Sequence, residues 1–265
     1  MLQTRILSAL VILPVVLFCA WFGHPWLTVL VAFVLSLGAL EFARLGRRAG
    51  HSTAPAIAVA IAGLLALERG FCGGRYQPLL LALALLAPAT WYVFHARLPT
   101  RLEAWGLTFL AALYVGFLGS HFVALRAMDN GFWWLALGVA TVWISDTGAY
   151  LVGRLWGSRR MAPHISPRKT WEGAVAGLLA ALAAGLLLSW PAGVATVHGL
   201  AIGAIVGVVS PLGDLAISVI KRQVGVKDSS NLIPGHGGML DRLDSLLFAA
   251  PLVYYYACLV AVPPV

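Results

Sequence analysis

Long apolar stretches recur along the chain, and they constrain its fold more than any other feature. Each is about 17–25 residues long, which is the length of helix that crosses the hydrocarbon layer of a bilayer. Because no water reaches that depth, a spanning backbone must satisfy its hydrogen bonds within helices or a closed barrel. The stretches are continuous and do not alternate between apolar and polar residues, so they favour helices. Hydrophobic residues make up 60% of the chain, and no polar stretch is long enough for a separate soluble domain.

We therefore predict an all-α, polytopic integral membrane protein with about nine transmembrane helices. The predicted spans are Ile6–Phe22, Trp26–Ala43, Ala54–Leu67, Pro78–Phe94, Leu107–Leu125, Phe132–Tyr150, Trp171–Trp190, Val197–Arg222 and Leu246–Val262. They form one integrated membrane domain, in which residues 1–131 are the N-terminal part and residues 132–265 carry the motifs described below. The first apolar run resembles a signal peptide, but it lacks a small-residue cleavage site and leads into further spans, so a retained helix is favoured.

The distribution of basic residues predicts the orientation of these spans. With the N-terminus in the cytoplasm, only Arg69, Arg75 and Arg126 of the 18 Lys and Arg residues fall on the far side. The net charge of +8 is then explained by anionic lipids and anionic substrates on the cytoplasmic side, and no nucleic-acid partner is expected.

Several common site types are excluded by the motifs that the chain lacks. Its cysteines, Cys19, Cys72 and Cys258, form no CxxC pair, which argues against a disulfide framework or a zinc site. There is no Walker A, GxGxxG or HExxH pattern, so ATP-driven pumping through a P-loop is not expected.

Two motifs flank the predicted loop after the sixth span. Asp146 lies near the end of that span and shares a helical stripe with Tyr150 and Arg154 if the helix continues. Ser166, Lys169 and Thr170 precede the seventh span, where the unpaired amides of a helix N-terminus favour an anion such as phosphate. Two plainer interpretations stay open: Asp146 as a pairing acid at a helix end, and Ser166 or Thr170 as a helix cap.

A third group of polar residues lies on and after the eighth span. Ser210, Asp214 and Ser218 are four residues apart and share one helical face, and Lys221 continues near it. Asp214 is about 12 Å from the helix end at Arg222 by helical rise, so its carboxylate needs a lysine, an arginine or a metal as partner.

The loop that follows is rich in glycine and charge. Gly237 and Gly238 allow backbone amides to approach phosphates closely, and Asp241 begins a charged segment that leads into the ninth span. Asp214 and Asp241 are candidates to hold one magnesium ion, which binds few carboxylates together with substrate phosphates. The alternative is a solvated charged loop without a ligand.

These residues resemble the signature of a known enzyme family. The pattern Ser218-x-x-Lys221-Arg222-x4-Lys227-Asp228, then His236-Gly237-Gly238, then Asp241-Arg242-x-Asp244, is similar to that of the phosphatidate cytidylyltransferases, the CDP-diacylglycerol synthases. The SDTGAY and SPRKTWEG segments also resemble that family. The resemblance is strong in the C-terminal half, whereas residues 1–131 agree only in their apolar character.

The resemblance implies an integral membrane enzyme that converts CTP and phosphatidate into CDP-diacylglycerol and pyrophosphate. It implies magnesium dependence, a second ion such as K⁺, a homodimer, and metal binding by Asp214 and Asp241. For this chemistry we expect Asp214, Asp241, Lys221 and Arg222 to be catalytic. The expected substrate-binding residues are Ser166, Lys169, Thr170, Ser218, Lys227, Asp228, His236, Gly237, Gly238, Arg242, Asp244 and Asp146. The protein is expected in a bacterial-type inner membrane, surrounded by membrane lipids, with its active site on the cytoplasmic side.

Two other functions are compatible with a polytopic membrane chain. Another transferase acting on a lipid phosphate would differ in its choice of nucleotide. A transporter would place polar groups along a path to both membrane faces, but the outer halves of the spans carry few ionisable residues.

Overall fold

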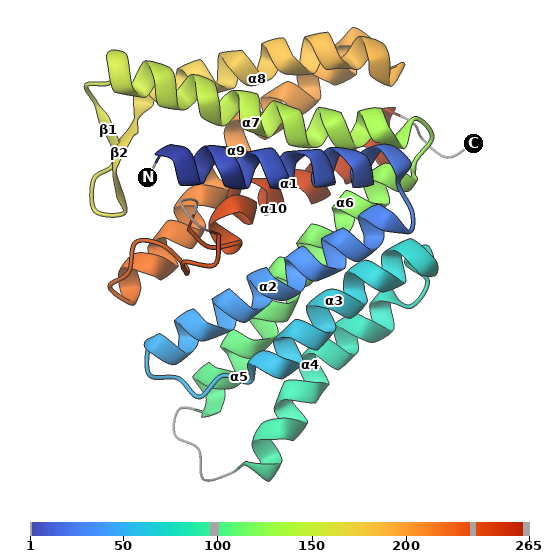
Figure 1. Ribbon diagram of the computed structural model, residues 1–265, viewed down its shortest axis with the longest axis vertical. Coiled ribbons are helices and arrows are strands. Elements are labelled where there is room, and N and C mark those ends of the chain that lie inside the picture. Colours follow the sequence, from blue (N-terminus) through green and yellow to red (C-terminus); the bar gives the residue numbers. More distant parts are fainter. Residues whose placement is uncertain (1, 96–100, 234–236, 262–265) are drawn as a thin grey trace. The chain divides into compact units, whose positions relative to one another are not determined.

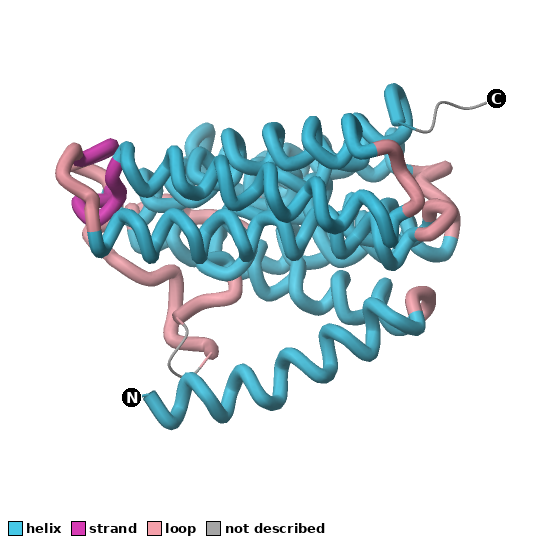
Figure 2. Tube along the Cα trace, turned by 90° about the horizontal axis from the view of Figure 1, so that it is seen from above, coloured by secondary structure: helices cyan, strands magenta, loops and turns pink. Residues whose placement is uncertain are grey.

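The computed structural model describes residues 2–95, 101–233 and 237–261, and most of them are helical (Figures 1 and 2). The elements are α1 (Leu2–Phe22), α2 (Trp26–Arg48), α3 (Pro55–Phe71), α4 (Gln77–Phe94), α5 (Arg101–Leu110), the π-helical segment η1 (Ala111–Phe117), α6 (Leu118–Ala127), α7 (Gly131–Leu155), β1 (Arg160–Ala162), β2 (Ser166–Thr170), α8 (Trp171–Ala192), α9 (Thr196–Gln223), α10 (Leu240–Tyr256) and η2 (Ala257–Ala261).

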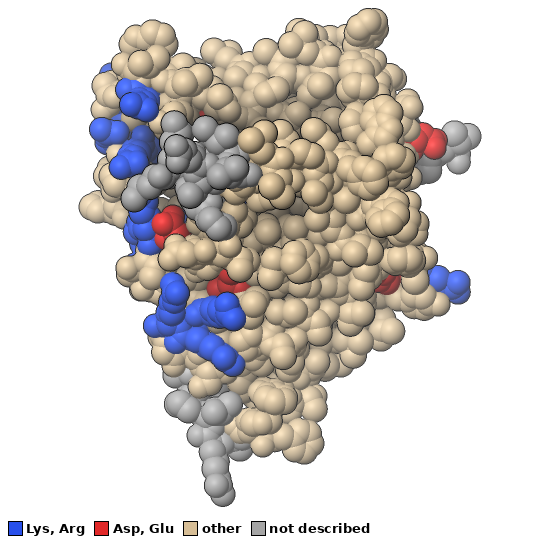
Figure 3. All heavy atoms as spheres, in the orientation of Figure 1, with Lys and Arg blue, Asp and Glu red and all other residues tan. Residues whose placement is uncertain are grey.

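Seven helical stretches within the described ranges are long and apolar enough to cross a membrane. They are α2, α4, the α5–η1–α6 stretch, α7, α8, α9, and α10 with η2. Two further predicted spans coincide with α1, whose Leu10–Phe22 portion is apolar, and with α3, which has 17 residues. Most of the surface in Figure 3 is uncharged, and its Lys and Arg side chains lie at the edges. These observations confirm a multi-pass helical protein; Val262, the predicted end of the last span, lies outside the described residues.

The chain divides into two compact units. The first comprises Met1–Ala127 and Gln223–Leu243. In it, α2 and α3 pack against each other and against η1, while α3 also contacts α4 and α6 (Figure 1). Leu35, Phe42 and Leu65 are fully or almost fully buried in this unit, as expected for apolar residues on the inner faces of packed helices.

The second unit comprises Met128–Arg222 and Asp244–Val265, and in it α7 and α8 pack side by side (Figure 1). Helix α9 approaches α8 through Gly199, Gly203 and Gly207, which are four residues apart. A methyl group on Gly203 would lie 2.5 Å from the carbonyl oxygen of Ala181 on α8. The glycines therefore allow two backbones to approach closely, and their partner is another helix of the same chain.

A short antiparallel hairpin, β1–β2, departs from the all-α prediction (Figure 2). Its register pairs Arg160 with Thr170 and Ala162 with Ser166. Pro163 and Pro167 lie in this segment, and proline disfavours a helix by removing a backbone donor. Strand β2 leads directly into α8, so the hairpin carries the residues that were expected to bind phosphate.

We predict that Gly203→Ala lowers the free energy of unfolding of the purified protein by about 1–3 kcal/mol, and with it the unfolding temperature, because the added methyl group overpacks the α8–α9 contact. Gly106→Ala is the matched control, since a methyl group added there would have no other atom within 4 Å. Thermal unfolding in detergent measures both variants. Equal unfolding temperatures would contradict a close backbone contact at Gly203.

Candidate functional site

Asp214 is the centre of a polar cluster in the second unit. The Lys169 ammonium lies 2.8 Å from its Oδ2 atom, and the Ser218 hydroxyl donates to Oδ1 at 3.1 Å. Lys169 also donates to the carbonyl oxygen of Pro211 at 3.0 Å. The Lys169 and Asp214 side chains are 22% and 37% exposed, so the pair is partly desolvated but open to a ligand. The predicted need of Asp214 for a cation is met here by Lys169.

Two more carboxylates belong to this cluster. The Ser210 hydroxyl donates to Oδ1 of Asp146 on α7 at 2.9 Å. The charges of Asp146, Asp214 and Asp244 lie close enough to interact with one another electrostatically. The approach of α9 to α10 is aided by Gly213, because a methyl group there would lie 2.5 Å from the carbonyl oxygen of Asp244. The Lys169 ammonium thus interacts with Asp214 and Asp146, whereas Asp244 interacts with Lys221.

Basic residues at the end of α9 adjoin this cluster. Lys221 is 7% exposed and interacts electrostatically with Asp244. Arg222 donates from Nε to the carbonyl oxygen of Ile165 at 3.1 Å, which links α9 to the hairpin. Both side chains were predicted to be catalytic, and both lie in the second unit with Asp214.

The hairpin and the start of α8 hold the residues of the proposed phosphate cradle. Thr170 caps α8 by accepting a hydrogen bond from the Gly173 amide at 3.2 Å, which confirms the capping interpretation. Ser166 lies four residues earlier on β2, and Lys169 lies between them in sequence. The Glu172 carboxylate accepts a hydrogen bond from the Ser158 hydroxyl at 2.6 Å, so it fastens the start of the hairpin to α8.

Asp241 lies in the first unit, in the first turn of α10. Its Oδ2 atom accepts hydrogen bonds from the Ser229 amide at 2.8 Å, the Ser229 hydroxyl at 2.9 Å and the Gly238 amide at 3.0 Å. Gly237 has φ +82°, a conformation that favours glycine, and it lies beside Asp241 and Asp228. This loop therefore folds tightly around one carboxylate oxygen of Asp241.

The remaining predicted residues of this segment lie near the surface. Lys227, Asp228 and Arg242 are exposed. His236 was predicted to bind substrate and lies outside the described residues. Asp214 and Asp241 belong to different units, so their sharing of one metal ion stays a prediction.

The donors in the second unit fit a magnesium ion. Asp146, Asp214 and Asp244 offer carboxylate oxygens, and Ser210 and Ser218 offer hydroxyls, which are the hard ligands that magnesium prefers. Within the part of the chain that is described, no three His, Cys, Asp or Glu side chains are close enough to hold a metal by themselves. Magnesium usually takes one or two protein carboxylates and completes its shell with water and substrate phosphates, so the two facts are compatible.

Sequence reasoning missed Glu41, an acid within the second predicted span. It is 2% exposed and accepts hydrogen bonds from the Ser229 hydroxyl at 2.9 Å and the Ser230 hydroxyl at 2.6 Å. The signal was available, because an ionisable residue inside a transmembrane run is a candidate functional residue by itself.

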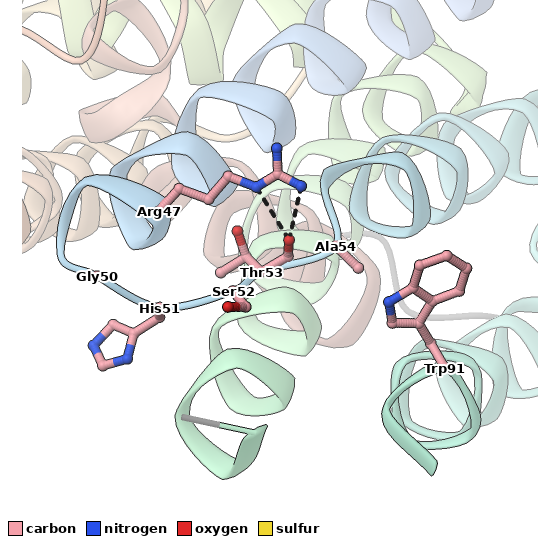
Figure 4. A pocket seen from close by; sticks show the side chains of 7 residues that line it. All are labelled: Arg47, Gly50, His51, Ser52, Thr53, Ala54 and Trp91. Carbon is pink, nitrogen blue, oxygen red and sulfur yellow. Dashed lines mark hydrogen bonds between the residues drawn. The ribbon is translucent and has the colours of Figure 1, made fainter. Parts of the chain in front are cut away.

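A pocket of about 440 Å³ opens in the first unit between Arg47, His51 and Trp91 (Figure 4). Arg47 donates from Nε and Nη2 to the carbonyl oxygen of Thr53, at 3.2 and 3.1 Å. Its lining includes none of the predicted site residues that lie within the described ranges.

Comparison with known proteins shows similarity over the whole chain. The sequence model of the Cytidylyltransferase family matches residues 3–260. The phosphatidate cytidylyltransferase of Synechocystis sp. is 34% identical, with 96% of each chain covered. The phosphatidate cytidylyltransferase of Brucella suis is 34% identical, and the alignment covers 100% of this chain and 96% of the relative. The phosphatidate cytidylyltransferase of Pseudomonas aeruginosa is 37% identical, with 95% of each chain covered. The similarity thus includes residues 1–131.

We predict that Lys169→Met lowers the unfolding temperature, because it leaves the partly buried Asp214 carboxylate without its cation. Adding Asp214→Asn should recover part of the loss. A double-mutant cycle in detergent should then give a coupling of about 0.5–3 kcal/mol, the range for contacting residues. Additive effects of the two substitutions would show that the pair contributes nothing to stability.

Proposed function

The chain belongs to the cytidylyltransferase family, and we propose that it transfers the cytidylyl group of CTP to phosphatidate, giving CDP-diacylglycerol and pyrophosphate for phospholipid biosynthesis. The relatives named phosphatidate cytidylyltransferase align over nearly all of their own length, which supports carrying the activity over as a whole. One structural observation supports it most: the carboxylates of Asp146, Asp214 and Asp244 lie close to one another, with Lys169 and Lys221 as nearby cations and serine hydroxyls as donors.

The chemistry fits a site without a strong general base. The attacking group is a phosphate oxygen of phosphatidate, which is already anionic. The main barrier is repulsion between two anions, so positioning and electrostatic stabilisation supply most of the catalysis. The cations of the site are therefore its essential components.

We assign the metal role to Asp214 and Asp241, with Mg²⁺ as the resident ion and K⁺ as a second ion. When bound, magnesium neutralises charge on the nucleotide phosphates and on the pyrophosphate leaving group. Asp146 and Asp244 lie close enough to Asp214 to interact with it electrostatically, and they supply further oxygens.

The basic residues hold the phosphates. Lys169 uses two of its three N–H donors on Asp214 and Pro211, which leaves one for a phosphate of the substrate. Lys221 and Arg222 hold the reacting phosphates, and Lys227 and Arg242 attract the nucleotide from the surface. Arginine binds a phosphate as a fork and lysine binds it as a point charge. Ser166, Thr170, Ser218, Asp228, His236, Gly237 and Gly238 complete the proposed substrate site.

The proposed membrane arrangement follows from the same chemistry. CTP arrives from the cytoplasm and phosphatidate arrives from the bilayer, so we place the site at the cytoplasmic side of a bacterial inner membrane. We propose nine spans, with α1 and α3 added to the seven long ones, and a cytoplasmic N-terminus. Residues 1–131 supply the N-terminal helices, residues 132–265 carry most of the catalytic motifs, and the protein functions as a homodimer.

Incubation of the purified protein with radiolabelled CTP and phosphatidate, followed by lipid extraction, tests the activity. Label should enter the lipid phase, EDTA should stop the transfer, and magnesium should restore it. Asp214→Asn and Asp241→Asn should each abolish transfer in protein that still inserts and folds. Label that stays in water under all metal conditions would refute the reaction, and labelling from another nucleotide would indicate a different lipid-phosphate transferase. Full activity of Asp214→Asn would refute its metal role alone.

The proposed orientation predicts that Cys72, exposed just after α3, faces away from the cytoplasm. In a variant with Cys19→Ser and Cys258→Ser, a membrane-impermeant maleimide should label Cys72 in intact cells with a permeabilised outer membrane. The same variant with Cys72→Ser added is the negative control, because none of its three native cysteines remains. Labelling only after the inner membrane is lysed would reverse the proposed orientation.

A further inference from the structure

Glu41 is a buried carboxylate that the proposed chemistry does not use. It lies on α2 with 2% of its surface exposed, next to fully packed residues such as Phe42 and Ala43. A buried carboxylate is costly unless it is hydrogen-bonded or paired, so its partners indicate its purpose.

The hydrogen-bond donors to Glu41 come from one segment about 190 residues later in the sequence. The hydroxyls of Ser229 and Ser230 donate to Oε2 and Oε1 at 2.9 and 2.6 Å. The amides of Met239 and Leu240 donate to Oε1 and Oε2 at 3.0 and 2.8 Å. Glu41 therefore holds both ends of the segment from Ser229 to the start of α10, and it satisfies amides that the helix itself leaves unpaired.

Asp241 is held by the same segment. Its Oδ2 atom accepts from the amides of Ser229 and Gly238, which lie next to the residues that Glu41 binds. The Ser229 hydroxyl lies 2.9 Å from both Glu41 Oε2 and Asp241 Oδ2. Because a hydroxyl has one hydrogen, it can donate to only one of the two carboxylates at a time. Ser229 therefore contacts both carboxylates, and the donors to Asp241 belong to the segment that also donates to Glu41.

We propose that Glu41 is a positioning residue for metal binding by Asp241: it anchors both flanks of the loop whose amides and hydroxyl orient the Asp241 carboxylate. The inference rests on the proposed role of Asp241 as a metal ligand. Groups that orient a metal ligand without touching the ion commonly change metal affinity by about 10–100-fold when they are substituted.

A purely structural role for Glu41 predicts a different result. In that case its loss would lower stability and leave the metal affinity of the folded protein unchanged. Glu68 offers a matched control, because it is also a buried acid of the first unit, on α3, and accepts a hydrogen bond from the Tyr76 amide at 2.7 Å. It therefore anchors the turn between α3 and α4, a different part of the chain from the Asp241 loop.

The test measures Mn²⁺ binding to the full-length protein in detergent by electron paramagnetic resonance, without substrates or turnover. Wild-type protein, Glu41→Gln, Glu68→Gln, Ser229→Ala and Asp241→Asn are compared, each with its thermal unfolding curve. We expect Asp241→Asn to abolish the tightest site and Glu41→Gln to weaken it about 10–100-fold. Ser229→Ala should weaken it about tenfold, the effect of one hydrogen bond to a charged group. Glu68→Gln should bind Mn²⁺ as the wild type does.

Each outcome separates this inference from the proposed activity. If folded Glu41→Gln binds Mn²⁺ with wild-type affinity, the positioning role is overturned, but the proposed cytidylyl transfer is not. If Glu41→Gln does not fold, wild-type affinity in Ser229→Ala overturns it instead. If Glu68→Gln weakens Mn²⁺ binding as much as Glu41→Gln does, the effect reflects a general loss of stability, and the positioning role is overturned as well. Absence of Asp241-dependent Mn²⁺ binding in the wild type would remove the metal role of Asp241 and this inference with it, whatever the transfer assay shows.

Discussion

The structure depends on giving its carboxylates hydrogen-bond donors or a cation among packed, mostly apolar helices. In the second unit, the Lys169 ammonium lies 2.8 Å from Asp214, and serine hydroxyls donate to Asp214 and Asp146. In the first unit, hydroxyls and backbone amides donate to Glu41 and Asp241. Both arrangements offset the cost of burying a charge, but they use different donors. In the second unit the partners of the carboxylates include a charged ammonium. In the first unit they are neutral amides and hydroxyls, which hold the carboxylates in place by several hydrogen bonds.

These two kinds of surroundings differ in how easily the carboxylate can exchange its partners. An ammonium that pairs with a partly exposed carboxylate can also bind a further anion, because it has three N–H donors. A carboxylate held by several amides cannot move without losing all of those hydrogen bonds together.

Much of this arrangement could be predicted from the sequence. Bilayer thickness restricts the helices, so the apolar runs located every long helix, and four-residue spacing placed Ser210, Asp214 and Ser218 on one face of α9. The need of Asp214 for a cation was also predictable, although the choice of Lys169 from three possible kinds of partner was not. The β1–β2 hairpin was missed because short strands with two prolines carry no apolar periodicity. Glu41 could have been singled out as an acid inside an apolar run, but its partners could not, because they lie about 190 residues away and no local pattern reports such a distance. The sharing of a metal by Asp214 and Asp241 stays a prediction.

The separation between Glu41 and its partners in the sequence also matters while the protein is being made. A ribosome adds about 5–20 residues per second, so α2 waits about 10–40 s before Ser229 and Ser230 emerge. During that interval the Glu41 side chain has none of its final donors. Until then the Glu41 carboxylate needs other donors, from water at the lipid–water boundary or from the insertion machinery. Synthesis of the segment from Ser229 to the start of α10 would then give α2 its last hydrogen-bond partners.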